Sequence, residues 1–310
     1  MSKNIDTEKI GIFKIAIGLT AFIFFAELIA GYLTNSLALL SDSAHVFMDA
    51  FALTLSWFAV YICSFPPTET RTYGWHRMEV FAAFINGTTL LFISAFILYK
   101  AYFRIISPQH VESTGMFIVA AIGLAANLIV AFWLRDFSRD DLNVKSAYLH
   151  VVWDALASIG VIIGAVIIHY TGWFVVDPII SMGIGIIIIS GALRIVKEST
   201  HILLEGVPTD IDTQKVIEDI KGVEGVTGIH NLHIWSLCSN IYAMSAHIDI
   251  EPDALEHQKE IIASINEKLA HRYHIAYTTL QTECKTCLTG SIFRTMEHSE
   301  KGHTHYPQSE

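Results

Sequence analysis

Six long apolar segments constrain the fold of this chain more than any other feature of its sequence. Each contains enough nearly uncharged residues to cross the hydrocarbon core of a bilayer as an α-helix, which takes roughly 20 residues. The chain is 52% hydrophobic and only 16% charged, with a mean hydropathy of +0.45, which is too apolar for an ordinary soluble domain. We therefore predict an integral protein of the lipid bilayer, an all-α bundle with six spans: Ile10–Leu33, Ser36–Ser64, Val80–Ile106, Met116–Leu134, Leu142–Tyr170 and Phe174–Val196.

The basic residues predict how these spans are oriented. If the amino terminus is cytoplasmic, the outer connections carry only Lys100 and Arg104, and the remaining basic residues of this region lie mainly on the inner side. Because short cytoplasmic loops are enriched in Lys and Arg, both termini are predicted to be cytoplasmic. The inner basic residues are Lys3, Lys9, Arg71, Arg77, Arg135, Arg139, Lys145 and Lys197.

The last third of the chain has a different composition. From Val207 to the carboxyl terminus there are 15 acidic and 8 basic residues, and nine of the 15 histidines lie here. The pattern predicts a helix, two strands, a second helix and a third strand, over residues 212–220, 228–237, 241–250, 252–272 and 275–282. We therefore predict a transmembrane domain over residues 1–206, a cytoplasmic αββαβ domain of the ferredoxin-like α+β class over 207–290, and a disordered His-containing tail over 291–310.

The acidic balance excludes one class of function and favours another. Nucleic-acid binding needs concentrated positive charge, which this sequence lacks. A negative protein is better suited to handling cations. Cys284 and Cys287 form a CKTC pair, which can be a disulfide, a redox motif or a pair of metal ligands, and a cytoplasmic location favours metal.

Ionisable residues inside two predicted spans are the strongest functional signal. His45 and Asp49 lie four residues apart in the second span. His150 and Asp154 repeat that spacing in the fifth. Residues four apart share one face of an α-helix, about 6 Å apart along its axis. If the two helices face each other, they offer two imidazole nitrogens and two carboxylate oxygens to one ion, a tetrahedral set suited to zinc.

Burial in hydrocarbon makes a ligand role more attractive for this quartet than for a single residue. One buried His or Asp usually forms a hydrogen bond between helices. Four ionisable groups are costly there unless they are paired or ligated, and a divalent cation compensates both carboxylates. Asp42, one turn before His45, is either a secondary metal-binding group or a helix-end residue, and Glu27 is expected to hydrogen-bond inside the bundle.

Protons compete with zinc for the same atoms, because zinc binds neutral imidazole and ionised carboxylate. A site that opens alternately to each side would therefore exchange zinc for protons without a separate proton pathway. Nitrogen ligands favour zinc, cadmium or cobalt over manganese.

Five segments carry these and other distinctive residues: SLALLSDSAHVFMDAFAL (Ser36–Leu53), TYGWHRMEVFAAFING (Thr72–Gly87), HVVWDALASIGVIIG (His150–Gly164), VVDPIIS (Val175–Ser181) and GIHNLHIWSL (Gly228–Leu237). All five resemble segments of the cation diffusion facilitator family, especially its zinc-transporting members. The resemblance extends over about residues 9 to 287. It implies a homodimer that exports Zn²⁺ from the cytoplasm in exchange for protons, with a transport site formed by His45, Asp49, His150 and Asp154.

The resemblance also implies a zinc site in the cytoplasmic domain. His230 lies near the start of the first predicted strand, His247 near the end of the second and Glu283 just after the third. Residues that match these three help to bind zinc in the family. His233, which alternates with apolar residues in a strand, is expected to be structural. The alternative is that these histidines are ordinary surface residues.

Further residues could add to these sites. Cys284 and Cys287 resemble carboxyl-terminal cysteines that ligate metal in animal relatives. Gln281 stands where some members have a ligating His, and because glutamine is a poor zinc ligand, the cysteines would compensate. His76 could contribute to a loop site like that of some bacterial relatives, although two nearby arginines would repel a cation.

Two rival functions remain open at this point. One is an intramembrane zinc metalloenzyme, since zinc with an open coordination position can activate water. The sequence lacks an H-E-x-x-H motif and a carboxylate placed as a general base, so we predict no enzyme activity. The other is a metal sensor that binds without transporting. The compact loops, with no His-rich insertion between spans four and five, favour a bacterial inner (plasma) membrane over an organellar one.

Overall fold

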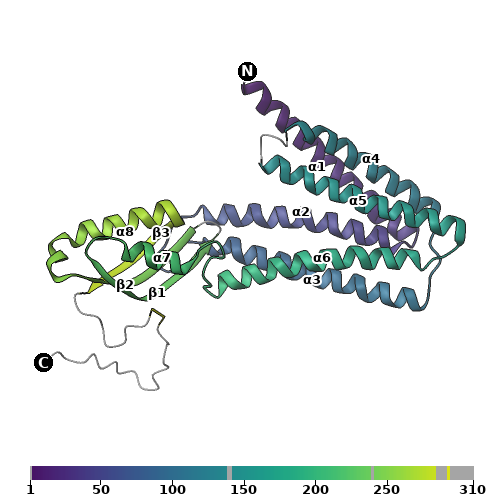
Figure 1. Ribbon diagram of the computed structural model, residues 1–310. Helices are drawn as coiled ribbons and strands as arrows, with labels where there is room; N and C mark the ends of the chain where they lie inside the picture. Colours follow the sequence, from purple (N-terminus) through teal and green to yellow (C-terminus); the bar gives the residue numbers. More distant parts are fainter. Residues whose placement is uncertain (1, 138–141, 239–240, 284–291, 294–310) are drawn as a thin grey trace. The chain divides into compact units, whose positions relative to one another are not determined.

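The computed structural model describes residues 2–137, 142–238, 241–283 and 292–293 (Figure 1). The chain forms two compact units. The membrane unit comprises Met1–Phe65 and Phe81–Ser199, and the second unit comprises Pro66–Val80 and the chain from Thr200 onward. The short segment between the second and third spans therefore belongs to the same unit as the carboxyl-terminal part of the chain. This second unit resumes at Thr200, a few residues before residue 206, where the transmembrane domain was predicted to end.

The membrane unit consists of long helices that coincide with the six predicted spans. Among the described residues, α2 to α6 are long and apolar enough to cross a membrane, and the apolar part of α1 with described side chains is Gly18–Leu33. The predicted helical bundle is confirmed. The helices are α1 (Ser2–Leu33), α2 (Leu37–Cys63), α3 (Arg77–Ile106), α4 (Ser113–Phe137), α5 (Leu142–Thr171) and α6 (Val176–Leu203).

The outer surface of this bundle is apolar and its interior is packed with small and aliphatic residues. Large hydrophobic side chains are exposed on every helix, which water would penalise but lipid would not. Inside, Ala38 and Leu39 of α2 pack against α4 and α5. Helices α1 and α2 approach closely because Gly31 has no side chain; a Cβ there would lie 2.9 Å from the side chain of Leu40. Examples of the exposed residues are Phe22, Trp57, Phe92, Phe132, Trp153 and Ile187.

A buried carboxylate fixes the beginning of α2. Asp177 at the start of α6 accepts hydrogen bonds from the Ser36 hydroxyl at 2.6 Å and from the first two backbone N–H groups of α2 at 2.8 and 3.1 Å. The Arg104 guanidinium lies 3.6 Å from the same carboxylate and donates to the backbone and side-chain oxygens of Asn35, both at 2.7 Å. Ser36 is the N-cap of α2, and its hydroxyl accepts from the Leu39 N–H at 3.2 Å; Asp177 satisfies the first two N–H groups from a different helix. Helices α2, α3 and α6 are therefore tied together at one end.

The second unit has the predicted αββαβ order. Its elements are α7 (Thr213–Lys221), β1 (Val226–Cys238), β2 (Ile241–Ile250), the 3-10 helix η1 (Pro252–His257), α8 (Gln258–Tyr273) and β3 (Ile275–Glu283). The sheet order is β1-β2-β3, with β1 antiparallel and β3 parallel to β2. The parallel pairing needs a crossover, which α8 provides. The predicted α+β class is confirmed.

Alternation along the strands separates a core face from a polar face. Met244, Ala246 and Ile248 of β2 belong to the hydrophobic core, which also includes residues of α7 and α8. The residues that alternate with them along β2 point to the opposite face, because successive side chains of a strand alternate. His247 and Asp249 are among these residues, so the polar side chains of β2 share one face of the sheet.

Two contacts complete the second unit. Arg77 Nη2 lies 2.8 Å from Glu205 Oε1, which joins the segment Pro66–Val80 to the chain that follows α6. Ile292, within the predicted tail, packs against the core of this unit, and its carbonyl accepts a hydrogen bond from the backbone N–H of Leu232 at 2.9 Å. Phe293, also in the predicted tail, is exposed, and residues 291 and 294–310 lie outside the described residues.

Candidate metal sites

Three of the four predicted transport residues converge between α2 and α5. His45 Nε2 lies 3.7 Å from Asp49 Oδ2 on the same helix and 3.9 Å from Asp154 Oδ1 on α5. His150 is in α5, one turn before Asp154, and its side chain lies outside the described residues. Helical spacing accounts for the first contact, whereas the second requires α2 to face α5. His45 thus lies beside one carboxylate of its own helix and one carboxylate of α5, although among the described residues these three side chains do not form a group whose ligand atoms all lie within 4.8 Å of one another.

This group is not sealed inside the bundle. The side chains of His45, Asp49 and Asp154 are 32%, 36% and 17% exposed. These three side chains are therefore partly accessible at the surface of the bundle.

Two more carboxyl groups lie deeper in the bundle. Glu27 of α1 and Asp42 of α2 are both almost completely buried, and the Asp154 carboxylate is close enough to act on both electrostatically. Glu27 Oε2 makes no hydrogen bond to another described residue. Gly123 of α4 leaves room for Glu27, since a Cβ there would lie 3.1 Å from Glu27 Oε1. The residues around His45, Asp49 and Asp154 therefore include two further, buried carboxyl groups.

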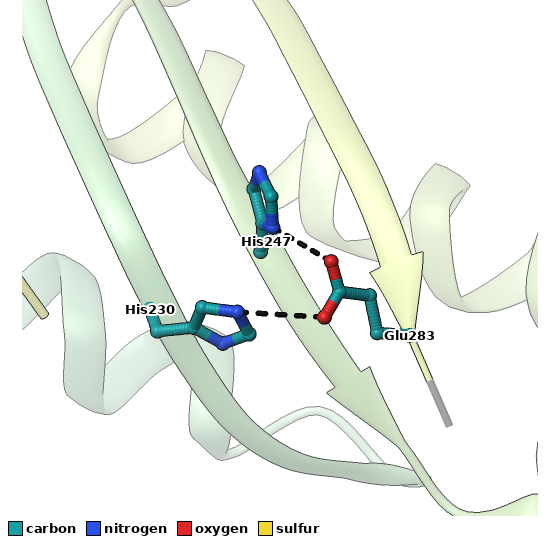
Figure 2. A group of neighbouring side chains, drawn as sticks. All are labelled: His230, His247 and Glu283. Atoms are coloured by element: carbon teal, nitrogen blue, oxygen red, sulfur yellow. Dashed lines mark hydrogen bonds and ion pairs between the residues drawn. The ribbon is translucent and has the colours of Figure 1, made fainter. Parts of the chain in front are cut away.

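The second group lies on the polar face of the sheet. Figure 2 shows His230 on β1, His247 on β2 and Glu283 at the end of β3, with both imidazoles beside the carboxylate. His247 Nδ1 lies 2.7 Å from Glu283 Oε1, and His230 Nε2 lies 3.5 Å from Glu283 Oε2. One ligand atom from each residue falls within 4.8 Å of the others. In the described part of the chain this group has the spacing needed to hold one metal ion.

Strand pairing explains why these residues meet. His230 is the cross-strand partner of His247 in the antiparallel ladder. Gln281 is paired with His247 in the parallel ladder, which brings Glu283 to the same end of the sheet. Gln281 Nε2 donates to Glu283 Oε1 at 3.0 Å, so its amide contacts the carboxylate. Cys284 and Cys287 follow Glu283 directly but lie outside the described residues.

The residues of this group fit a bound cation. Both ring nitrogens of His230 are buried and make no hydrogen bond to another described residue. Buried polar atoms of this kind are costly unless something binds them. Two imidazoles and one carboxylate are a common donor set for zinc, which also accepts a fourth ligand.

Comparison with known proteins identifies the family. Residues 13–204 match the family model described as the cation efflux transmembrane domain, and residues 208–285 match the one described as the cation efflux protein cytoplasmic domain. The chain belongs to the cation efflux family. The predicted resemblance to cation diffusion facilitators is therefore confirmed.

Similar proteins are known from several bacteria. The metal cation efflux system protein CzcD of Cupriavidus metallidurans is 40% identical over 88% of this chain and 86% of its own. The cadmium, cobalt and zinc/H(+)-K(+) antiporter of Bacillus subtilis is 38% identical over 83% of both chains. The zinc transporter ZitB of Yersinia pseudotuberculosis is 37% identical over 89% of this chain and 88% of its own. A solved structure, the metal-bound C-terminal domain of a CzcD transporter, is 29% identical and covers 24% of this chain and 99% of that one, with a TM-score of 0.22.

Family membership decides between classes of function. Cation efflux proteins are transporters and not enzymes, so the alternative of an intramembrane metalloenzyme is not supported. This efflux protein is a multi-pass integral membrane protein, as its apolar helices predict.

One acidic residue of the second site escaped the sequence prediction. Asp249 on β2 is buried, and its Oδ2 lies 3.4 Å from Nδ1 of His230. The available signal was the alternation along β2, which places Asp249 on the same face as His247. The sequence prediction missed Asp249 because this residue is not part of any recognisable metal-binding motif.

Other sequence candidates lie elsewhere. His76 is in the segment Pro66–Val80 and does not belong to a three-ligand group among the described residues. Nε2 of His233 lies 3.3 Å from the side-chain oxygen of Asn231. The tail histidines His298, His303 and His305 lie outside the described residues.

Proposed function

We propose that this efflux protein exports divalent metal cations from the cytoplasm, with zinc as its main substrate, in exchange for protons. The observation that carries this proposal is the position of His45 on α2, which lies beside Asp49 on its own helix and beside Asp154 on α5 inside a membrane bundle. We propose His150 as the fourth ligand, because it lies one turn before Asp154 on the same helix.

The donor set supports zinc as the cargo. Imidazole and carboxylate together suit zinc, cadmium and cobalt, whereas carboxylates alone would suit manganese. The relatives named above include a zinc transporter and an antiporter for cadmium, cobalt and zinc. We therefore expect cadmium and cobalt as secondary substrates.

Competition between zinc and protons supplies the coupling. Zinc needs neutral His45 and ionised Asp49 and Asp154, so a proton that binds any of them weakens the site. When the site faces a more acidic outside, protons displace zinc, and they return inward as the site reopens to the cytoplasm. The direction of the pH gradient thus sets the direction of zinc transport.

The cytoplasmic site would hold a resident ion instead of cargo. We propose that His230, His247 and Glu283 bind zinc there, with Cys284 and Cys287 as further ligands. A zinc ion at this place would link three strands and steady the domain of a homodimer. We also propose that both termini are cytoplasmic and that the membrane is a bacterial inner membrane.

Zinc uptake into proteoliposomes tests the function. The purified protein is reconstituted, a pH gradient is imposed, and radioactive zinc inside the vesicles and the internal pH are followed together. We expect uptake that stops when the gradient is collapsed and that falls to the level of empty liposomes in His45→Ala and Asp154→Ala. His271→Ala, at the exposed end of α8, is the matched control and should transport like the unmodified protein.

The same assay distinguishes a transporter from a metal sensor, the remaining alternative function. A sensor would bind zinc in detergent but show no gradient-dependent uptake. Wild-type-like exchange of zinc for protons by His45→Ala or Asp154→Ala would refute the assignment of the transport site.

A further inference from the structure

We propose that Asp249 is a positioning residue of the cytoplasmic metal site, which holds the His230 imidazole so that Nε2 faces Glu283 and His247. This role rests on the proposed binding of a metal ion by His230, His247 and Glu283. Asp249 would not touch the ion itself but would act through the imidazole.

The two nitrogens of His230 face two different carboxylates. Nδ1 lies 3.4 Å from Asp249 Oδ2, and Nε2 lies 3.5 Å from Glu283 Oε2. When the ring proton is on Nδ1, directed toward Asp249, the lone pair of Nε2 is available to a cation on the other side of the ring. Metal-binding histidines commonly donate their second N–H to a carboxylate, which fixes the tautomer and makes the ligand more basic.

Burial makes this arrangement specific. The side chains of His230 and Asp249 are 6% and 10% exposed, so water does not freely replace either partner. Among the described residues Asp249 forms an ion pair with His230 and with no Lys or Arg. A buried carboxylate without a basic partner is costly. A divalent cation on the far side of the imidazole would offset that cost, because it would polarise the Nδ1–H that faces Asp249 and place a positive charge nearby.

Gly228 provides an independent observation. It is the cross-strand partner of Asp249. A Cβ at Gly228 would lie 2.6 Å from Asp249 Oδ2 and 3.4 Å from its Cγ. Gly228 is not among the glycines with positive φ, so its backbone conformation does not itself require glycine. The missing side chain instead leaves the space that the Asp249 carboxylate occupies beside His230.

A purely structural role for Asp249 predicts something different. A carboxylate that stabilised the sheet would be expected to accept hydrogen bonds, yet Asp249 Oδ1 is buried and has no hydrogen-bond partner among the described residues. Removing such a group should not weaken the metal-free fold. Its loss should instead appear in metal binding.

Zinc titration of the full-length protein in detergent tests this role. Asp49→Ala and Asp154→Ala are introduced together as a background that silences the transport site, and zinc affinity is measured by competition with a chelating dye. His230→Ala identifies the site, since it should remove one bound zinc ion. Asp249→Ala should retain that ion with an affinity lowered about 10- to 100-fold, the usual effect of losing such a partner.

Three further variants sharpen the test. Asp249→Asn keeps an oxygen that can accept from Nδ1 and should lose less affinity than Asp249→Ala. Gly228→Ala keeps the charge but pushes the carboxylate away, so its loss should approach that of Asp249→Ala. Asp253→Asn, an exposed acid in η1, is the control and should bind zinc normally. With cobalt in place of zinc, the visible absorption should shift in Asp249→Asn while the number of bound ions is unchanged.

The outcomes are distinguishable. Unchanged zinc affinity in Asp249→Ala, or a lower thermal midpoint of the metal-free protein with unchanged affinity, would overturn the positioning role while leaving the site intact. Loss of the ion itself in Asp249→Ala, as in His230→Ala, would make Asp249 a direct ligand and would also overturn it. If His230→Ala binds as much zinc as the background, the proposed site fails, and Asp249 has nothing to position.

Discussion

The two candidate metal sites use the same kinds of side chain in different surroundings. In the membrane unit, the side chains of His45, Asp49 and Asp154 are 32%, 36% and 17% exposed. In the second unit, those of His230, His247 and Glu283 are 6%, 27% and 13% exposed. The first site is thus more open than the second. Cargo must enter and leave, whereas a resident ion is best held by ligands that water cannot easily replace.

The residues around the two candidate sites also differ in kind. The side chains of the candidate site in the second unit have nearby polar partners: Asn231 Nδ2 lies 3.3 Å from His247 Nε2, and Gln281 donates to Glu283. The neighbours identified around the transport residues include the acids Glu27 and Asp42. Polar partners fix the orientation of a ligand. The two sites thus differ in their surroundings although their side chains are of the same kinds.

The largest expected effect is a loss of zinc transport that occurs in a variant of the membrane site and not in a variant of the second site. Asp154→Asn should reduce zinc uptake to the level of empty liposomes, because the site loses a charge that binds both zinc and the returning proton. His247→Ala should lose one bound zinc ion and keep most of its transport. Uptake in proteoliposomes and bound zinc in detergent are measured on the same preparations. Equal losses of transport in both variants would contradict the proposal that the membrane site binds the transported ion and the second site binds a resident ion.

The next effect contrasts two helix caps. Asp177→Ala removes the carboxylate that accepts from the first two N–H groups of α2 and leaves the Arg104 side chain, 15% exposed, beside no carboxylate, which should destabilise the membrane unit by about 3–5 kcal/mol. Asp212 caps α7 locally and on the surface, accepting from the Gln214 backbone N–H at 3.0 Å. Asp212→Ala should cost only about 1 kcal/mol. Thermal unfolding in detergent measures both, and similar losses would contradict the view that α2 depends on a cap from another helix.

Selectivity should respond to the ligand type at the open site. His45→Asp replaces a nitrogen ligand by oxygen, which favours larger cations and weakens the preference for zinc. The ratio of zinc to cadmium uptake should therefore fall severalfold. His247→Asp serves as the comparison and should leave that ratio unchanged. An unaltered ratio in His45→Asp would count against direct coordination by this residue.

The smallest effect concerns alkaline stability of the second unit. Burial, and then the Asp219 carboxylate that accepts the Tyr273 hydroxyl at 2.5 Å, raise the pKa of Tyr273 from 10.0 to about 12. A raised pKa means that the folded state favours the protonated phenol, so this stabilisation is complete below pH 10 and disappears as the pH rises through about 12.

Tyr273→Phe tests that expectation. At neutral pH the variant should be less stable by about 1 kcal/mol, the usual value of one hydrogen bond. The difference from the unmodified protein should shrink as the pH rises from 10 toward 12. Denaturant unfolding at several pH values measures it. A gap that widens in this range would show that the sign of the pKa shift is wrong.

Much of the architecture followed from local sequence patterns. The length of each apolar run set the membrane helices, because only a helix satisfies its own backbone in lipid. The helical period placed His45 and Asp49 on one face of α2, and alternation in the strands favoured the αββαβ order. These predictions succeeded because they depend on residues that are neighbours in the chain.

Contacts between distant segments were decided by the tertiary structure alone. Sequence spacing could not show that α2 faces α5, nor that Asp177 of α6 caps α2. It also could not place Asp249 behind His230, because that contact depends on the register between β1 and β2. Local periodicity fixes which face a side chain occupies, but the packing of whole elements determines what lies opposite it.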